Sequence, residues 1–497
     1  MRLVEGVSLF DHQMKAVKFC TSRDAALICF TTGSGKSLIN IATAIWHTND
    51  NIDKFIVVVT ASSIIELEND FAKFTGDIPP RVKRTEDLIR FLDSKDPIAL
   101  VQYNWLKDFV EYKEVETRFG NRVYCNIKGE VHAAMAGKRI GISFDEAHML
   151  KTPKSMLAKA AKAFRKEVVA CYGFTATPVT RELMDIYYVS EILSPGWFGS
   201  YNRFCANYIL SYKMGNIKKI YGYKNLDKLN KELSGLMLTY FPEKKINFVK
   251  HACDLTRRDD YEEAARGLFE VDVPDELEDV GDADEAVSSE EAKTFSARLV
   301  DLQYIVDEDP AKLEKFVSLV KENLSTGMIV FCAYHRSIGV IKDVLKKENI
   351  QHREITGKNT TKARKAAKDW FNDDPTNKVL ILSKAGGQSL NLQSCPTFIF
   401  YETPQNPASL LQALGRIVRI GSAYDEFFIH FVIVDDTVDQ YKYDYVSQNK
   451  EVFEKVMNNK TLPTSNALSG YNSFIIDKLK RKYLWNRHEK NIFRDRH

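Results

Sequence analysis

The sequence predicts an α/β protein made of two successive lobes, each organised around a parallel sheet. Short apolar, β-branched runs alternate with helical patterns through most of the chain, as they do in βαβ units. These runs fall into two sets, and a strongly acidic stretch separates the sets. The expected strands are 25–30, 55–60, 98–102, 139–144 and 168–174 in the first lobe, and 327–332, 352–356, 378–383, 397–401 and 427–434 in the second.

The composition indicates a chain with large apolar cores in a reducing compartment. Of 497 residues, 44% are hydrophobic. The longest apolar run, 55–65, is broken by Thr60, Ser62 and Ser63 and is far shorter than the ~20 residues that span a membrane. The eight cysteines are scattered without a CxxC pair, which indicates reduced thiols. With no apolar leader in view, we expect a cytoplasmic protein, or a nuclear one in a eukaryote, with no membrane partner.

Charge is distributed unevenly along the chain. Residues 271–291 hold ten Asp and Glu and no Lys or Arg, so without them the formal charge of +3 becomes +13. A basic remainder favours a polyanionic partner. We expect 271–291 to be a solvated insertion in a linker over 246–295, with a partner-docking element or a DNA mimic as the alternatives. The predicted lobes are then 1–245 and 296–445, followed by a basic extension, 446–497.

A glycine-rich loop in the first lobe has the pattern of a phosphate-binding loop. It follows an apolar run, precedes a helical pattern, and reads Thr31-Thr32-Gly33-Ser34-Gly35-Lys36-Ser37. Glycines let backbone N–H groups turn toward phosphates, and the following helix N-terminus adds a favourable dipole. Lys36 is expected to contact the β/γ-phosphates and Ser37 to bind Mg²⁺. Phe30 stands where the general pattern has its first glycine, so a simple turn before a helix is the alternative.

Two adjacent carboxylates at the end of another expected strand strengthen this interpretation. Asp145 and Glu146 begin the sequence Asp145-Glu146-Ala147-His148. Asp145 is expected to hold Mg²⁺ through water, and Glu146 to orient and deprotonate the attacking water. In isolation such a pair could be a surface turn. A phosphate-binding loop and a carboxylate pair on separate strands of one sheet predict a nucleoside triphosphatase.

These motifs resemble those of superfamily 2 helicases, and the resemblance continues along the chain. The sequences at 174–178, 383–392 and 412–421 resemble motifs III, V and VI, and Phe10-Asp11-His12-Gln13 resembles the upstream glutamine motif. The stretches 145–155, 194–204 and 412–422 are similar to the Swi/Snf-like branch. The match spans roughly residues 8–445. It implies two tandem RecA-like lobes with an ATP site in the cleft between them.

The resemblance implies further roles at that site. Gln13 would read adenine, and Arg419, together with Arg416, would reach the phosphates from the second lobe when the lobes close. The two arginines are three apart in an expected helix and so share one face. Gln412 lies one turn earlier and could contact the same phosphate or water. Without the other motifs, this run reads as a basic helix face.

The family also implies contacts to a DNA backbone across both lobes. Short hydroxyl and amide side chains at strand ends can bind phosphates without selecting bases. The expected positions are Thr60, Ser62, Tyr103, Tyr334, Ser383, Lys384 and Asn391. Each is also a common cap or turn residue. His148, Thr175 and Thr177 are candidates for coupling the ATP site to this track.

Two basic, aromatic segments are candidates for additional DNA contacts. A β-hairpin is predicted over about 207–225, carrying Lys213, Lys218 and Lys219, and an aromatic hairpin can stack on bases at a strand junction. A packed hairpin with solvated lysines is the alternative. At the C-terminus, 474–497 reads either as a DNA-binding segment or as an amphipathic helix against the second lobe.

The function expected from the sequence is that of an ATP-dependent DNA helicase or translocase, which remodels branched DNA such as forks and recombination intermediates. Such a protein can act as a monomer. One alternative is a duplex translocase that displaces proteins without separating strands. Another is the motor subunit of a nuclease complex. An RNA helicase fits the motif details less well.

Overall fold

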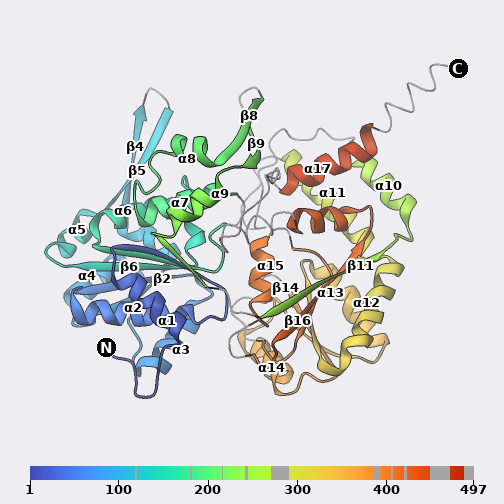
Figure 1. The fold of residues 1–497 in the computed structure, drawn as a ribbon, viewed down its shortest axis with the longest axis horizontal. Helices are drawn as coiled ribbons and strands as arrows, with labels where there is room; N and C mark the ends of the chain where they lie inside the picture. Colours follow the sequence, from blue (N-terminus) through green and yellow to red (C-terminus); the bar gives the residue numbers. More distant parts are fainter. Residues whose placement is uncertain are drawn as a thin grey trace. The chain divides into compact units, whose positions relative to one another are not determined.

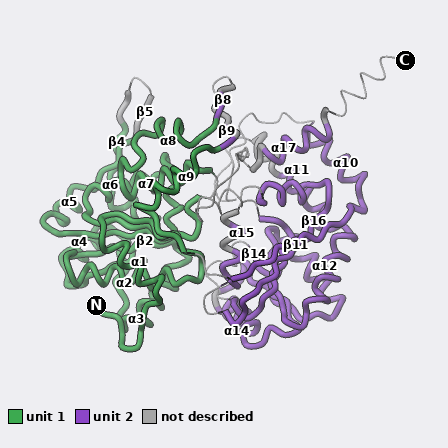
Figure 2. Tube along the Cα trace, in the orientation of Figure 1, with its two compact units in different colours: residues 1–210, 223–242, 455–463 green, residues 211–222, 243–454, 464–497 purple. Residues whose placement is uncertain are grey.

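A computed structural model describes the chain at residues 1–117, 120–179, 182–214, 217–240, 244–269, 290–383, 392–404, 407–418, 422–447 and 471–485. These residues form two compact units (Figure 2). Unit 1 comprises those described within 1–210 and 223–242, and unit 2 those described within 211–222, 243–454 and 464–497.

Unit 1 is built on a six-stranded parallel sheet in the order β10-β1-β7-β6-β2-β3. Figure 1 labels β2 and β6 of this sheet. Its strands are β1 Ala25–Phe30, β2 Lys54–Val59, β3 Ile98–Gln102, β6 Ile140–Asp145, β7 Ala170–Thr175 and β10 Met237–Tyr240. Its helices are α1 Asp11–Thr21, α2 Lys36–Asp50, α3 Ile64–Thr75, α4 Thr85–Asp93, α5 Gly129–Met135, α6 Met156–Glu167, α7 Met184–Leu193, α8 Tyr201–Tyr208 and α9 Leu226–Leu233.

Both faces of this sheet are covered, which explains the nearly continuous apolar runs of its strands. Alternate side chains point to opposite faces, so Ile28 and Val57 join buried residues of α1, α2 and α3 in one core. On the other face Leu27 approaches Gly173 and Leu193 of α7. Each fully buried aliphatic side chain contributes about 1.5–3 kcal/mol to folding, so this packing stabilises the sheet strongly.

Unit 2 contains a second six-stranded parallel sheet, in the order β11-β16-β15-β12-β14-β13. Figure 1 labels β11, β14 and β16 of this sheet. Its strands are β11 Lys245–Cys253, β12 Met328–Cys332, β13 Gln351–Ile355, β14 Lys378–Ser383, β15 Thr397–Phe400 and β16 Glu426–Val434. Its helices include α10 Arg258–Gly267, α11 Glu290–Asp307, α12 Pro310–Asn323, α13 His335–Lys347, α14 Thr361–Asp373, α15 Pro407–Leu414 and α17 Tyr471–Lys480.

The second sheet is also sandwiched between two apolar layers. Met328 and Val330 pack with α12 and α13, whereas Ile329 and Phe331 pack with α10, α14, α15 and α17 on the opposite face. Helix α12 begins where the side chain of Asp309 accepts a hydrogen bond from Ala311 N at 3.0 Å, just before a proline suited to the first turn.

All ten strands predicted from the sequence are present, and the prediction of two parallel α/β lobes is confirmed. Two edge strands, β10 and β11, were not predicted. Strand β11 and helix α10 lie in the stretch expected to be a linker, and β11 pairs with β16 along its whole length. Most of the acidic stretch 271–291 lies outside the described residues.

Two hairpins and the C-terminal helix complete the fold. The predicted hairpin is present as β8 Ile209–Met214 and β9 Ile217–Tyr223, and a second hairpin, β4 Val110–Thr117 with β5 Gly120–Ile127, was not predicted. Helix α17 buries Phe474, Ile475 and Leu479 in the core of unit 2, as expected for an amphipathic helix. In the part of the chain that is described, no helix has both the length and the apolar character of a membrane span.

Candidate nucleotide site and its surroundings

The predicted catalytic residues of unit 1 gather at one edge of its sheet. Because the strands are parallel, the carboxyl ends of β1, β2, β3, β6 and β7 lie at the same edge. Ligands of open α/β sheets bind at this edge. It carries the glycine-rich loop after β1, the carboxylates at the end of β6, and Thr175 at the end of β7.

The glycine-rich loop has the backbone that its sequence predicts. Gly33 and Gly35 have φ values of +79° and +80°, a left-handed conformation that favours glycine, and α2 begins at Lys36. The Lys36 ammonium donates hydrogen bonds to the carbonyls of Phe30 at 3.0 Å and Thr31 at 3.2 Å. The amine is thereby held inside the loop, where a phosphate would replace neutral carbonyl partners.

Two side chains of helix α1 contact this loop. The Gln13 side chain is buried, donates from Nε2 to the carbonyl of Ser34 at 3.2 Å, and accepts from Phe10 N at 3.0 Å. His12 Nε2 lies 3.2 Å from the same Ser34 carbonyl, and its ring stacks on Tyr240 at 4.1 Å. The contact between His12 and Tyr240 was not predicted from the sequence, because it depends on β10 joining the sheet beside β1.

The paired carboxylates stand on a turn with unusual backbone geometry. Glu146 has φ +50°, in the left-handed region, and it precedes the short 3₁₀ helix η2, Ala147–Leu150. Burial and the neighbouring Glu146 charge raise the pKa of the Asp145 carboxyl to about 7, although Lys36 opposes the shift. Two acidic groups and one amine therefore share a poorly hydrated site, an arrangement suited to binding a cation.

A chain of polar contacts leads from Glu146 to the neighbouring strand. His148 Nδ1 lies 3.3 Å from Glu146 Oε2 and 3.0 Å from the hydroxyl of Thr175. Thr175 in turn accepts from Thr177 N at 3.1 Å, and both threonines are fully buried. The three candidate coupling residues are thus linked in the order His148, Thr175, Thr177.

A residue that sequence reasoning missed touches the metal-binding candidate. Burial raises the pKa of the Asp70 carboxyl, on α3, and the nearby Ser37 side chain opposes the shift. Among the described residues, no cluster of three or more His, Cys, Asp and Glu is arranged to hold a metal ion. A carboxyl paired with a loop hydroxyl has no local sequence pattern.

The predicted DNA contacts of unit 1 divide into exposed and buried residues. Thr60 lies at the end of β2, where its hydroxyl contacts those of Ser62 at 3.0 Å and Ser63 at 2.7 Å, and Ser62 is exposed. Tyr103, by contrast, is buried, and its hydroxyl donates to the carbonyl of Asp145 at 2.7 Å. The expectation that the Tyr103 side chain faces DNA is therefore wrong, because that side chain holds the end of β6 instead.

The candidates of unit 2 are described only in part. Tyr334 is half-buried at the start of α13, and Ser383 is buried at the end of β14. Helix α15 ends at Leu414, so Arg416 lies in the following turn, with Arg416 N bonded to Ala413 O at 3.2 Å. The prediction that one helix carries both arginines is wrong for Arg416. Outside the described residues lie Arg419, Lys384 and Asn391 and the side chains of Gln412, Lys213, Lys218 and Lys219.

Fold and site together define a class. A glycine-rich loop between β1 and α2, facing two carboxylates at the same edge of a parallel sheet, is the arrangement of a P-loop nucleotide-binding protein. Residues 12–245 match the SNF2-related domain, and residues 311–421 match the helicase conserved C-terminal domain. The chain belongs to the Swi/Snf-like branch of superfamily 2, a family of ATP-dependent helicases and SNF2-type translocases.

Individual relatives are distant but extensive. The chain is 21% identical over 415 residues to an uncharacterized ATP-dependent helicase of Mycoplasma genitalium, covering 81% of this chain and 37% of that protein. It is 25% identical over 345 residues to the uncharacterized ATP-dependent helicase YqhH of Bacillus subtilis, covering 64% and 59%. It is 22% identical over 463 residues to a SWI/SNF-related matrix-associated actin-dependent regulator of chromatin subfamily A-like protein 1 homolog of Caenorhabditis elegans, covering 90% and 62%.

The chain therefore spans about 37% to 62% of the length of these relatives. Among solved structures, the Pyrococcus furiosus Hef helicase domain aligns with a TM-score of 0.51 at 15% identity, covering 87% of this chain and 96% of that one. That likeness supports the fold of two tandem RecA-like lobes.

Proposed function

We propose that this chain is an ATP-driven motor that moves along DNA and remodels duplex or branched substrates such as forks and recombination intermediates. The observation that carries the proposal is the chain of contacts at the sheet edge, which runs from Glu146, next to Asp145, through His148 to the buried Thr175. It connects a nucleotide site to the strand end beside it, which a motor requires and a simple nucleotide-binding protein does not.

The residues at this edge fit ATP with Mg²⁺. Gly33 and Gly35 open the loop backbone, Lys36 supplies a cation, and Ser37 and Asp145 supply oxygen ligands suited to a hard metal ion. The metal would neutralise charge on the phosphates. Glu146 would accept a proton from the attacking water, and His148 beside it would hold that carboxylate in position.

Arg416 and Arg419, with Gln412, are proposed to contact the phosphates of the bound nucleotide. Thr60, Ser62 and Tyr334 are proposed to contact the DNA backbone, together with Lys384 and Asn391, whereas the Ser383 side chain is buried. Phosphate contacts of this kind give little sequence preference, as a motor needs. A second candidate, tracking along duplex DNA without strand separation, is favoured by the SNF2-related match over 12–245.

The test is ATP hydrolysis with no DNA and with single-stranded, duplex, forked and four-way DNA. We expect stimulation by duplex-containing substrates. Glu146→Gln should reduce turnover by about 10²-fold or more while still binding ATP, because only the proton acceptor is lost. Lys36→Ala should lose both. Equal hydrolysis with and without every DNA would contradict the proposal. Strand displacement from a fork then separates the two candidates.

A further inference from the structure

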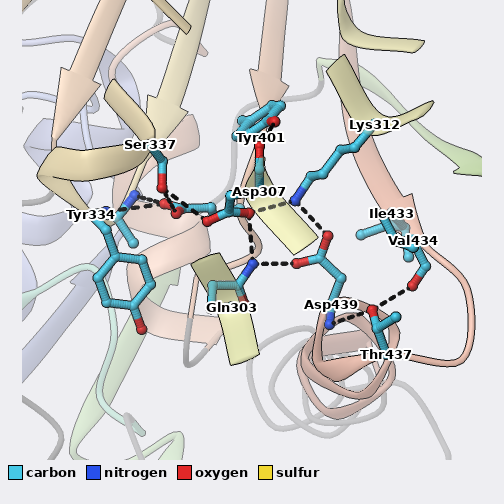
Figure 3. Close-up of polar contacts among 12 residues, drawn as sticks. Gln303, Asp307, Lys312, Tyr334, Ser337, Tyr401, Ile433, Val434, Thr437 and Asp439 are labelled. Atoms are coloured by element: carbon cyan, nitrogen blue, oxygen red, sulfur yellow. Dashed lines mark hydrogen bonds and ion pairs between the residues drawn. The ribbon is translucent and has the colours of Figure 1, made fainter. Parts of the chain in front are cut away.

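Unit 2 contains a fully buried polar cluster next to the start of α13 (Figure 3). Lys312 is fully buried and contacts Asp307 at 2.8 Å and Asp439 at 2.5 Å. Gln303 Nε2 donates to the same two carboxylates, each at 2.8 Å, and Lys442 donates to Gln303 Oε1 at 2.5 Å. Charges so deeply buried are stable only when they are paired and hydrogen-bonded, as they are here.

Glu402, just after β15, connects this cluster to the main chain that precedes α13. One carboxyl oxygen, Oε2, accepts hydrogen bonds from the backbone N–H groups of Ala333 and Tyr334, the latter at 3.1 Å. The other, Oε1, lies 2.6 Å from the hydroxyl of Ser337, which also lies 2.9 Å from Asp307 Oδ2. The single Ser337 proton cannot serve both carboxyls, so a second proton must be shared between Asp307 and Glu402.

That second proton belongs on Glu402. Burial and then the Asp307 charge raise the pKa of Glu402 well above its usual value. Burial also acts to raise the pKa of Asp307, but Lys312 and several hydrogen bonds outweigh it and lower that pKa. A neutral Glu402 leaves Asp307 and Asp439 balanced by Lys312 and Lys442. The cluster then carries no net charge, and Glu402 can both donate toward Asp307 and accept from the main chain.

We propose that Glu402 is a positioning residue that sets the main chain at Ala333–Tyr334 and so aligns the start of α13 for contact with the DNA backbone. The cluster reinforces this from the other side, since the Lys442 ammonium lies 5.5 Å from the centre of the Tyr334 ring. The inference rests on the proposed function for its DNA contact, whereas the positioning of the main chain does not depend on it.

The experiment compares Glu402→Ala with Glu402→Gln in the full chain. The glutamine keeps an acceptor for both N–H groups and a donor for Asp307, whereas alanine removes the acceptor. For Glu402→Ala we expect the duplex DNA concentration that half-saturates ATPase stimulation to rise about 10-fold, and hydrogen exchange at Ala333 and Tyr334 to accelerate at least about 10-fold. DNA-independent hydrolysis and the KM for ATP should stay within about 2-fold of the wild type. Glu402→Gln should keep the wild-type half-saturating DNA concentration and the wild-type exchange rates at Ala333 and Tyr334.

Control variants distinguish a specific effect of Glu402 from a general loss of stability. Glu348→Ala removes a half-exposed carboxylate just after α13, paired with Lys321, and should change neither readout. If Glu402→Ala does not fold, Ser337→Ala removes the neighbouring hydroxyl and should raise both readouts about 3-fold. Unchanged exchange at Ala333 and Tyr334 would overturn the inference. A different outcome is that hydrogen exchange accelerates in Glu402→Ala but no DNA stimulates ATP hydrolysis by the wild type. That result would overturn the DNA contact and leave the positioning of the main chain intact.

Discussion

Alanine at Gly35 tests how the glutamine of α1 and the phosphate loop fit together. Gly35 has φ +80°, which costs a residue with a side chain about 1–2 kcal/mol. An added Cβ would also lie 2.1 Å from Gln13 Nε2, so the glutamine must swing away. It would lose its hydrogen bonds to Phe10 N and to the Ser34 carbonyl, at about 1 kcal/mol each. The total loss of folding free energy is then about 3–4 kcal/mol.

Gly6 provides a matched control, because it has φ +88° and no neighbour within 4 Å of an added Cβ. Gly6→Ala should cost only the backbone strain, about 1–2 kcal/mol. Calorimetry of the full chain measures both variants in the unfolding transition that shifts with ATP. In Gly35→Ala/Gln13→Ala, the cost of the Gly35 change should fall to that of Gly6→Ala. The reasoning fails if Gly35→Ala alone costs no more than Gly6→Ala.

Further predictions concern packing and pH. Gly173→Ala brings a methyl within about 3.0 Å of Ala147 Cβ, so it should lower the free energy of unfolding by about 1–3 kcal/mol and slow ATP hydrolysis. Gly129→Ala places its methyl in open space and should change neither quantity. Equal effects of the two variants in calorimetry and ATPase assays would contradict this. His251 Nε2 lies 2.8 Å from His430 Nδ1. Burial lowers the pKa of both side chains, and it lowers that of His430 from 6.5 to about 4. The unfolded chain then binds more protons, so stability is full above pH 6.5 and falls toward pH 4, by at most about 3 kcal/mol. Thermal unfolding between pH 7.5 and 5 measures this, and an identical pH slope in His430→Asn would refute it.

Local patterns were enough to predict the ten inner and edge strands named from the sequence and the place of the glycine-rich loop between β1 and α2. Apolar runs bounded by turn residues mark the buried parallel strands, and the loop ending in Lys36-Ser37 has few other structural uses. Edge strand β11 escaped prediction because its residues are mostly half-exposed and its apolar pattern is weak. Its place in the sheet comes from pairing with β16, about 180 residues away. Such pairing has no signature within a short window.

Side-chain direction was the other limit. A tyrosine directly after β3 resembles a phosphate contact in sequence, yet Tyr103 turns inward to hold the end of β6. Arg416 was assigned to a helix because Gln412, Arg416 and Arg419 have helical spacing, but the helix stops before Gly415. The buried contacts of Glu402 likewise join three elements that are distant along the chain. Each outcome depends on tertiary packing rather than on spacing.

ATP hydrolysis at the edge of the first sheet is proposed to drive movement along a duplex. Displacement of a labelled third strand from a DNA triplex measures such movement without requiring strand separation. The wild type should displace the third strand only with hydrolysable ATP, and Glu146→Gln should bind the DNA without displacing it. ATP hydrolysis that proceeds at full rate while the third strand stays bound would contradict the claim.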